Sequence, residues 1–438
     1  MKLLSFKKGI HPKYHKELTK DQPIQALLPK EELVYPMQQH IGSPCKPLVK
    51  KGDRVLVGQK IGEQTGYAGA PVHCSVSGTV KAVEERMTHQ GRLALCVVVT
   101  NDFAYEEIPE LKEARVKDYT SLTSEEIVEI VKEAGLVGMG GATFPTYIKL
   151  SPPKEKTIKH IIINGAECEP YLTSDHRVML EEGERIVEGI KIVLHMFKEA
   201  TAIIGIEDNK MDAVEKMKAY CEKESKIEVK VLETKYPQGS EKHLIYATTG
   251  LEVPSGKLPA DIGAIVLNVD SVIAIWRAVT KGRPIMRRIV TVSGNGVKKP
   301  SNFKIRLGMS FREVLEAAEW DEAATVKVIS GGPMMGTALS SVDVPIGKGT
   351  SAILCLTQKE VDKEATSPCI RCGKCVEACP MRLVPNALHR AALHHDDEAF
   401  LADFGMDCME CGCCSYVCPA SRQLVQSIRT AKNRVRQK

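Results

Sequence analysis

Two cysteine strings of the same spacing lie near the C-terminus, and they constrain what this chain of 438 residues can fold into more than any other feature. Each string reads C-x2-C-x2-C-x3-C-P. Three thiolates two residues apart can wrap one side of a metal centre, whereas the fourth is held off by an extra residue and turned away by proline. The strings are Cys369, Cys372, Cys375, Cys379, Pro380 and Cys408, Cys411, Cys414, Cys418, Pro419.

This run is the one that bacterial ferredoxins use to hold two [4Fe-4S] clusters, and the fourth cysteine of each string ligates the other cluster. Ligation is therefore expected to cross between the strings, and the chain is expected to carry electrons. Cys413 does not fit the spacing to Cys418, so we interpret it as a spare thiol beside a cluster. The expected ligands are Cys369, Cys372, Cys375 and Cys418 for cluster 1, and Cys379, Cys408, Cys411 and Cys414 for cluster 2.

Zinc and disulfides are the alternative uses of these cysteines. Zinc needs four ligands per ion and gains nothing from the third evenly spaced cysteine or the repeated C-P ending. Disulfides fit less well, because Lys7 and Lys8 interrupt the apolar start, no signal peptide is predicted, and a reducing compartment is expected. The remaining cysteines are scattered, and most are expected to be small core residues: Cys45, Cys74, Cys96, Cys168, Cys221, Cys355 and Cys413.

Length and composition predict several domains with cores of their own, since 43% of the residues are hydrophobic. The longest mostly apolar stretch, residues 262–276, is interrupted by Asn268 and Asp270 and is too short to cross a bilayer. We therefore expect a soluble or peripheral protein.

The basic surplus lies in the C-terminal tail, because residues 421–438 hold six Lys or Arg and no acid, against a net charge of +5 for the whole chain. Leu424, Ile428 and Val435 fall on one helical face there. Two interpretations are equally favoured: a basic amphipathic helix that meets an anionic membrane or an acidic partner, and a solvated, frayed terminus. Nucleic acid is disfavoured, because the tail has no aromatic residue to stack on bases.

The N-terminal part alternates short β-prone runs with glycine turns, at residues 50–61 and 71–80, as small all-β modules do. This pattern resembles the biotinyl/lipoyl barrel-sandwich domain. That family carries its cofactor on a hairpin lysine, and residues 61–80 contain none. The module is therefore interpreted as a scaffold.

A helix and a glycine loop open the next domain. Thr123 and Glu126 form a predicted capping box before an apolar stripe, and Gly135 can end the helix. The loop that follows, GMGGATFPTYIK at residues 138–149, leaves backbone N–H groups free to face an anion, and Lys149 can add a countercharge. It lacks the G-K-[ST] of a Walker loop and follows a helix, unlike the dinucleotide fingerprint.

A β-branched strand, predicted over residues 158–163, ends in Asn164-Gly165-Ala166-Glu167-Cys168-Glu169-Pro170. An amide and two carboxylates thus follow the C-terminal end of a strand, where α/β sheets bind ligands.

Together, the glycine loop and this segment resemble the flavin-bearing, NADH-oxidising subunit of respiratory complex I, over roughly residues 120–285. Residues 239–242 and 268–271 are similar to later flavin-contacting segments of that family. The resemblance implies that Gly138, Gly140, Gly141 and Lys149 face the FMN phosphate and ribityl chain, and that Asn164 and Asn268 fix the flavin. It further implies that Phe144, Glu167 and Glu169 meet the nicotinamide nucleotide.

Over its whole length, the chain most closely resembles the C subunit of the Rnf complexes, the membrane ferredoxin:NAD oxidoreductases that couple electron flow to ion translocation. The expected fold is multidomain α/β and β. Its parts are a barrel-sandwich module (1–110), an α/β FMN/NADH-binding domain (111–285), a β-grasp module (286–357) and an α-helical two-cluster ferredoxin domain with the tail (358–438).

The expected function follows from the cofactors. NAD(H) passes two electrons as hydride and each cluster accepts one, so FMN is needed between them, and no side chain is expected to act as nucleophile or proton shuttle. The resemblance implies a cytoplasmic-face location and partners that include other subunits, one of them an iron-sulfur subunit, and ferredoxin. His389, His394 and His395 lie between the strings, but eight cysteines already complete two clusters, so these histidines are expected at the surface or beside a cluster.

Two alternatives stay open. Met139, Thr143 and Tyr147 depart from the complex I loop, which favours an electron-transfer adaptor with a vestigial flavin fold. The other alternative is the diaphorase subunit of a soluble hydrogenase or formate dehydrogenase.

Overall fold

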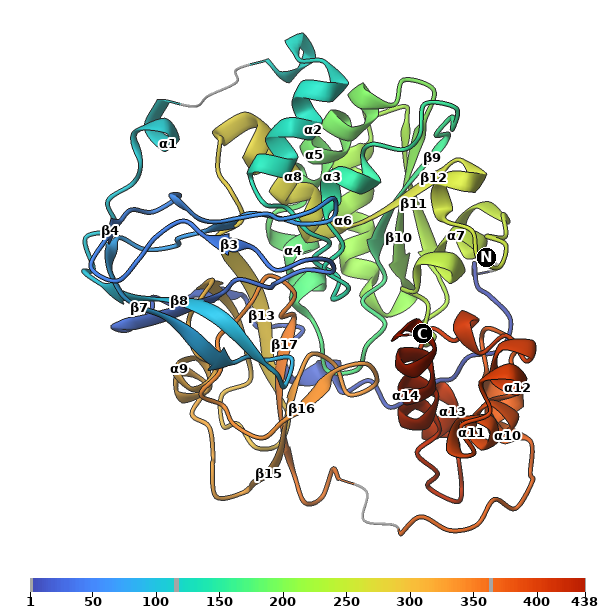
Figure 1. The fold of residues 1–438 in the computed structure, drawn as a ribbon. Helices are drawn as coiled ribbons and strands as arrows, with labels where there is room; N and C mark the ends of the chain where they lie inside the picture. Colours follow the sequence, from blue (N-terminus) through green and yellow to red (C-terminus); the bar gives the residue numbers. More distant parts are fainter. Residues whose placement is uncertain (1–2, 114–117, 362–364, 438) are drawn as a thin grey trace.

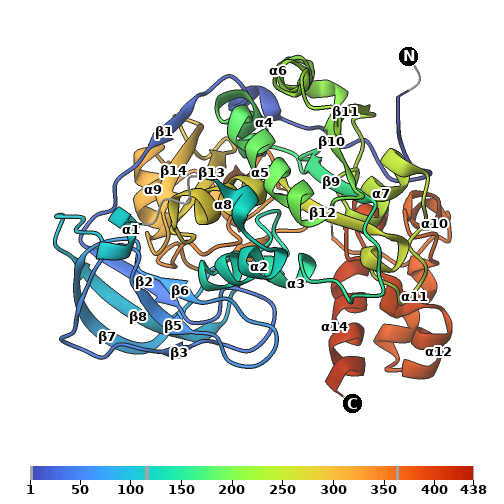
Figure 2. The ribbon, with the colours of Figure 1, turned by 90° about the horizontal axis from the view of Figure 1, so that it is seen from above.

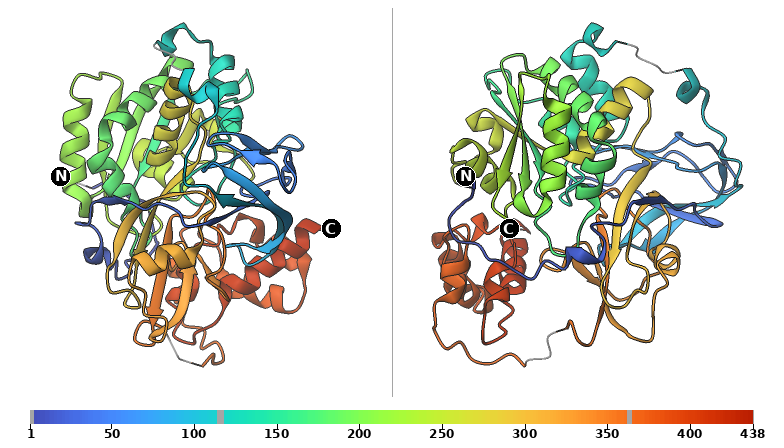
Figure 3. Two further views of the ribbon diagram at one scale, coloured as in Figure 1. Left: turned by 90° about the vertical axis from the view of Figure 1, so that its left-hand side faces the viewer. Right: turned by 180° about the vertical axis from the view of Figure 1, so that it is seen from behind.

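The computed structural model describes residues 3–113, 118–361 and 365–437, which form four units (Figure 1). Seen from above, the N-terminal sheets and the C-terminal helices lie on opposite sides of the molecule (Figure 2). In both views of Figure 3 the C-terminal helices (red) lie lower in the picture than most of the central unit (green). Within the described ranges, no helix combines the length and the apolar character needed to span a bilayer.

The N-terminal unit is a pair of small antiparallel sheets, which confirms the predicted barrel-sandwich fold. One has the strand order β2-β8-β7-β4 and the other β3-β5-β6. Its core is continuous with that of the β-grasp unit, because Leu33 and Val99 belong to the same apolar cluster as Val290 and Phe303. The strands are β2 (Glu32–Pro36), β3 (Lys46–Pro47), β4 (Arg54–Val55), β5 (Lys60–Glu63), β6 (Val72–His73), β7 (Gly78–Met87) and β8 (Leu93–Asn101).

The central unit is a four-stranded parallel sheet of order β11-β10-β9-β12 with helices on both faces. Ile161 and Ile163 of β9 pack against one set of helices, whereas Ile162 packs against α7 on the other face. Burial on both faces explains the continuous β-branched run of this strand. The strands are β9 (His160–Gly165), β10 (Thr201–Glu207), β11 (Ile227–Leu232) and β12 (Ala264–Asn268).

Helix α2 (Ser124–Glu133) confirms the predicted start and stop signals. Both hydrogen bonds of the capping box between Thr123 and Glu126 are present, and Gly135 follows the helix with φ 66°. The other helices of this part of the chain are α1 (Pro109–Glu113), α3 (Thr146–Lys149), α4 (Ser174–Glu181), α5 (Gly183–Met196), α6 (Met211–Cys221), α7 (Glu241–Thr249) and α8 (Val269–Lys281). Short 3-10 turns occur at Lys16–Leu18, Tyr119–Ser121, Asp208–Lys210 and Pro259–Ile262.

The β-grasp unit is a six-stranded sheet of order β1-β14-β13-β17-β15-β16. Its edge strand β1 comes from the start of the chain and pairs in parallel with β14. The residues before β1 run along the central unit, where Leu4 bridges to Leu232 and Ile10 to Tyr236. The elements are β1 (Ile24–Ala26), β13 (Arg287–Ser293), β14 (Ser301–Arg306), α9 (Phe311–Ala317), β15 (Thr325–Ser330), β16 (Thr337–Leu339) and β17 (Ala352–Thr357).

The C-terminal unit repeats one backbone turn in both cysteine strings. Arg371 and Gly373 flank Cys372 with φ 56° and 79°, and Glu410 and Gly412 flank Cys411 with φ 59° and 84°. A short helix follows each turn, so the sequence repeat is also a structural repeat. The helices are α10 (Lys374–Ala378), α11 (Pro385–Leu393), α12 (Asp397–Ala402), α13 (Cys413–Tyr416) and α14 (Leu424–Gln437), with a 3-10 turn at Gly405–Asp407.

Both interpretations of the C-terminal tail are wrong in one respect. The apolar face of the tail is not free to meet a membrane or a partner, and the tail is an ordered helix instead of a frayed terminus. Ile428 and Ala431 of α14 are buried in one apolar cluster with Leu388 of α11. Two of its basic side chains are engaged inside the unit, since Arg429 pairs with Glu410 at 2.7 Å and Arg434 with Asp397 at 2.5 Å. The tail is a structural helix of the cysteine unit, because covering that stripe removes apolar surface from water.

Candidate functional site

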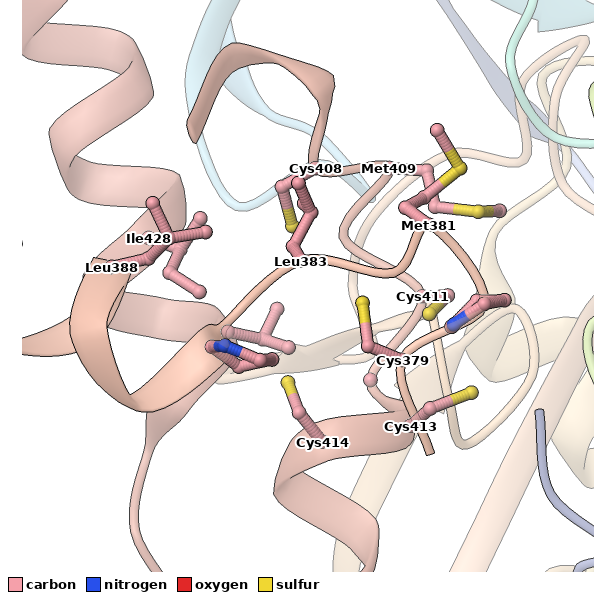
Figure 4. A pocket seen from close by; sticks show the side chains of 14 residues that line it. Cys379, Met381, Leu383, Leu388, Cys408, Met409, Cys411, Cys413, Cys414 and Ile428 are labelled. Carbon is pink, nitrogen blue, oxygen red and sulfur yellow. The ribbon is translucent and has the colours of Figure 1, made fainter. Parts of the chain in front are cut away.

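One cavity brings together four of the predicted cluster ligands. It lies between α11, α13 and α14. Cys379 comes from the first string, and the other three come from the second, as crossed ligation requires. Figure 4 shows the sulfur atoms of Cys379, Cys408 and Cys414 turned toward a common space, whereas that of Cys413 points away. The cysteines that line the cavity are Cys379, Cys408, Cys411, Cys413 and Cys414.

The walls of this cavity fit a [4Fe-4S] cluster. Apart from the thiols they are mainly apolar, with Leu383, Leu388 and Ile428 among them. Burial raises the pKa of Cys408 to about 11 and that of Cys414 to about 12. These thiols are therefore protonated at neutral pH without metal, and iron binding must release their protons.

Cys413 is fully buried, in one apolar cluster with Cys411. It thus lies beside the predicted ligands.

The other four predicted ligands lie on the outer side of the unit. Cys375 and Cys418 pack against the same apolar group, Leu424 and Val425. Cys369 and Cys372 are exposed, in the segment before α10. The cluster 1 position is therefore more accessible to solvent than the cluster 2 position.

The six scattered cysteines outside the two strings are all buried, as expected of core residues: Cys45, Cys74, Cys96, Cys168, Cys221 and Cys355. Of the histidines between the strings, His394 and His395 are exposed. His389 hydrogen-bonds with Ser427 at 2.6 Å and with Arg422 at 2.8 Å.

The predicted flavin segments converge at the C-terminal edge of the central sheet. Asn164 is the second-last residue of β9 and Asn268 is the last residue of β12, and the register places them opposite each other on these adjacent strands. Gly140 of the glycine loop lies next to Asn268, since a Cβ at Gly140 would lie 3.7 Å from the Asn268 Cβ. Gly239 also lies close to Asn164, since a Cβ at Gly239 would lie 3.5 Å from the Asn164 amide nitrogen. This amide donates to the Gly239 carbonyl at 2.8 Å.

The glycine loop presents open backbone donors. Gly140, Gly141 and Ala142 are exposed, and Gly141 has φ 106°, a conformation that favours glycine. In the part of the chain that the structure describes, the N–H groups of these three residues have no protein acceptor. Such an exposed run of N–H groups fits a phosphate.

Sequence reasoning missed the residue that anchors this loop. Arg288 on β13 is buried and donates to the Met139 carbonyl and to an Asp270 carboxylate oxygen, both at 2.9 Å. The Met139 N–H donates to Ser271 Oγ at 2.9 Å. A side chain of the β-grasp unit therefore holds the glycine loop, and no local motif in the sequence signals this contact.

The cysteine cavity adjoins the flavin segments through one apolar cluster. Buried Cys168, four residues after Asn164, shares this cluster with Tyr236, Cys411 and Cys413. The Tyr236 hydroxyl donates to the Cys411 carbonyl at 2.8 Å. The sheet edge and the cluster 2 cavity are thus neighbours.

Comparisons with known proteins match every unit. Family models match residues 4–104 (RnfC barrel sandwich hybrid domain), 131–277 (Nuo51 FMN-binding domain), 289–338 (SLBB domain) and 361–420 (4Fe-4S dicluster domain). The C subunit of the Na(+)-translocating ferredoxin:NAD(+) oxidoreductase complex of Acetobacterium woodii is 44% identical over 98% of this chain and 97% of its own length. This chain belongs to the RnfC family, the C subunits of ion-translocating ferredoxin:NAD(+) oxidoreductases.

Another member of this family, the C subunit of the proton-translocating ferredoxin:NAD(+) oxidoreductase complex of Clostridium ljungdahlii, is 44% identical over 88% of this chain and 84% of its own length. A solved NAD+-reducing [NiFe]-hydrogenase shares the fold over 75% of this chain and 69% of its own, with a TM-score of 0.54 and 17% identity. This RnfC-family chain is an electron-transfer subunit with an FMN-binding domain and a dicluster domain, which favours the first predicted function over the adaptor and the diaphorase.

Several predicted contacts of this RnfC-family chain are already engaged within the protein. Lys149 donates to Glu241 at 2.6 Å and to the Val266 carbonyl at 3.1 Å. Glu167 accepts from the N–H groups of Asp175 and His176 at the start of α4, at 2.7 and 3.2 Å. These side chains therefore also position the elements around the site.

Glu169 joins two units of the protein. Its carboxylate accepts from the N–H groups of Met334 and Met335, at 3.1 and 2.9 Å, in the loop between β15 and β16. Burial raises its pKa to about 7, against the lowering effect of these two N–H groups. Phe144, the remaining predicted nicotinamide contact, is partly exposed beside the glycine loop.

Asp175 is a further residue beside the predicted flavin segments that the sequence did not single out. It accepts from the Asn268 amide at 2.6 Å and so orients that side chain. Burial, together with the charges of Glu167 and Asp270, raises its pKa to about 8, although Arg288 opposes the shift. The sequence offered one signal for Asp175: it is an acidic residue in the first turn of the helix that follows the Glu167 segment.

Proposed function

We propose that this protein exchanges a hydride between NAD(H) and FMN at the C-terminal edge of the central sheet and passes single electrons on through two [4Fe-4S] clusters. The observation that carries this proposal is the apolar cluster of Cys168, Tyr236 and Cys411, which joins the flavin segments to the cysteine cavity. FMN, when bound, supplies the conversion between a two-electron hydride and the single electrons that iron-sulfur clusters accept.

In this proposal the chain binds and orients the cofactors and supplies no nucleophile. The open N–H groups of Gly140 and Gly141 take the phosphate, with Gly138 beside them, and Asn164 and Asn268 hold the flavin ring. Lys149 adds positive charge at this edge when its ammonium turns from Glu241.

The nicotinamide nucleotide is proposed to lie beside Phe144, Glu167 and Glu169. Phe144 offers a partly exposed aromatic face. The two glutamates shape the wall by holding α4 and the β15–β16 loop in place. NAD(H) binding at this wall is supported by the family to which the chain belongs.

Electrons are proposed to pass between the flavin and cluster 2 first, with cluster 1 farther out. Cluster 2 would be held by Cys379, Cys408, Cys411 and Cys414. The cavity of these cysteines adjoins the group of buried side chains that contains Cys168. Cluster 1 would be held by Cys369, Cys372, Cys375 and Cys418, two of which are exposed.

The test is an anaerobic titration of the iron-reconstituted chain with FMN and NADH, followed by flavin absorbance and cluster EPR. We expect NADH to bleach the flavin and to reduce at least one cluster. Asn268→Ala should weaken FMN binding. The control is Asn209→Ala, at an exposed position of the same unit, which should leave FMN binding unchanged. If dithionite reduces both clusters while NADH and FMN have no effect, the central unit is only a scaffold and the proposal fails.

We further propose that the chain works at the cytoplasmic face of the membrane with other subunits, one of which carries an iron-sulfur centre, and exchanges electrons with ferredoxin directly or through that subunit. Support comes from its family, whose members are subunits of ion-translocating complexes. Protease digestion of inside-out vesicles should cleave the chain, and digestion of right-side-out vesicles should not; the reverse result would refute this placement.

A further inference from the structure

A second groove lies directly against the cysteine cavity. It lies between the N-terminal segment, α7 and the turn that follows Cys379. Figures 1 and 2 both show that segment passing between α7 and the C-terminal helices. No role proposed above uses this groove.

The groove is lined by an excess of cations. Of the described residues that line it, Lys7, Lys242 and Arg382 are cations and Glu252 alone is a carboxylate. Lys7 and Arg382 are exposed, and Lys242 donates to the Pro254 carbonyl, at 3.3 Å. Among the described residues, none of these three cations forms an ion pair, so their charge faces the groove and solvent uncompensated.

The groove and the cavity share a wall. Pro380 and Met381 line both spaces, and Pro380 directly follows the predicted ligand Cys379. His243 holds this wall by a hydrogen bond to the Pro380 carbonyl at 3.2 Å, and Phe6 packs edge-on against His243 with ring centroids 4.6 Å apart. A molecule in the groove is thus separated from the cavity by one turn of chain.

We propose that this groove docks an acidic electron-transfer protein, whose surface carboxylates pair with Lys7, Lys242 and Arg382. One electron then passes between the redox centre of that protein and cluster 2 across the Pro380–Met381 wall, so that one centre is oxidised and the other is reduced without proton transfer. This inference rests on the proposed ligation of cluster 2 by Cys379. Complementary charge serves such a contact mainly by raising the association rate.

The test uses the reconstituted full chain and an acidic two-cluster bacterial ferredoxin as the probe, mixed anaerobically in a stopped-flow instrument. The groove variant carries Lys7→Glu, Lys242→Glu and Arg382→Glu. The control variant carries Lys51→Glu, Lys218→Glu and Lys304→Glu, three exposed lysines on other surfaces, and changes the net charge equally.

We expect the groove variant to lose at least about tenfold in the second-order rate of electron transfer from reduced ferredoxin, together with most of its salt dependence, because steering contributes at least about tenfold to such rates. The control should stay within about twofold, as its charges lie outside the contact. Equal losses in both variants would overturn the proposal. Competition by millimolar pyrophosphate with no effect of ionic strength would also overturn it, and would identify a small-anion site instead.

Dithionite reduction separates this proposal from the one on which it rests. Both variants should show the EPR signals of two clusters with dithionite. If the wild-type chain assembles no cluster that depends on Cys379, the ligand assignment fails. If it does assemble this cluster and the rate is insensitive to the groove charges, only the docking proposal fails.

Discussion

Removing the Arg288 guanidinium should destabilise the central unit and loosen the glycine loop at the same time. Arg288 is 2% exposed and Asp270 is 4% exposed, with 2.9 Å between Nη1 and Oδ2. In Arg288→Met the Asp270 charge stays buried without its partner, and the carbonyls of Met139 and Thr350 lose their donors. Breaking a buried pair from one side costs about 3–5 kcal/mol, so we expect a loss of this size in the free energy of unfolding.

The matched variant is Arg288→Met combined with Asp270→Leu, which removes both charges. It should recover most of the loss, because an apolar replacement of both partners is often close to neutral. FMN affinity should not recover, since the Met139 carbonyl still lacks its donor. Stability and flavin binding are thus expected to separate in the double variant.

The assay is urea unfolding of a Trp320→Phe background, in which Trp276 on α8 is the one remaining tryptophan and reports on the helix that carries Asp270. FMN affinity is measured in parallel by fluorescence quenching. A loss below about 1 kcal/mol for Arg288→Met, smaller than the cost of breaking a typical buried pair, would refute the reasoning.

Three further predictions concern the cysteine unit and the link between units. Cys414→Ala should abolish one of the two cluster EPR signals, whereas Cys413→Ala should keep both; the opposite pattern would reverse the ligand assignment. Ile428→Asp should lower the bound iron, measured by chelation assay, because it places a charge at a position of α14 that is 1% exposed; unchanged iron content would contradict the structural role of the tail. Glu169 has its pKa raised to about 7, so its contribution to stability is present at acid pH and is lost as the pH rises through about 7. Glu169→Gln should therefore flatten the thermal stability profile between pH 5 and 8, and an unchanged slope would show that Glu169 does not titrate in this range.

Local sequence patterns predicted those elements whose causes are local. The capping box of Thr123 and Glu126 starts α2, and Gly135 follows its end, because both signals act within one or two turns of the same helix. The strand before Asn164 was predicted from its β-branched run, although it begins at His160, two residues later than expected. Element boundaries depend on pairing with β10 and β12, which a single strand does not reveal.

The candidate site was predicted in part. The sequence pointed to the glycine loop and to Asn164 and Asn268, because each follows a recognisable strand or helix. It did not reveal Arg288 or the hydrogen bond from Asn268 to Asp175, since these contacts join residues that are 149 and 93 positions apart. It also left open whether the apolar face of the tail was covered, because the covering helix α11 is a separate segment.

The sequence by itself determined the chemistry of this protein: the spacing of eight cysteines specifies two iron-sulfur clusters and predicts crossed ligation, since each cysteine string is a local pattern. Only the tertiary structure decided how the parts are connected. It placed the cavity of Cys379 and Cys411 against the Cys168 segment, and it set Glu169 and Arg288 as links between units. The physical reason is that electron transfer and buried charge pairing depend on distances between distant segments, which packing of the whole chain sets and no local motif contains.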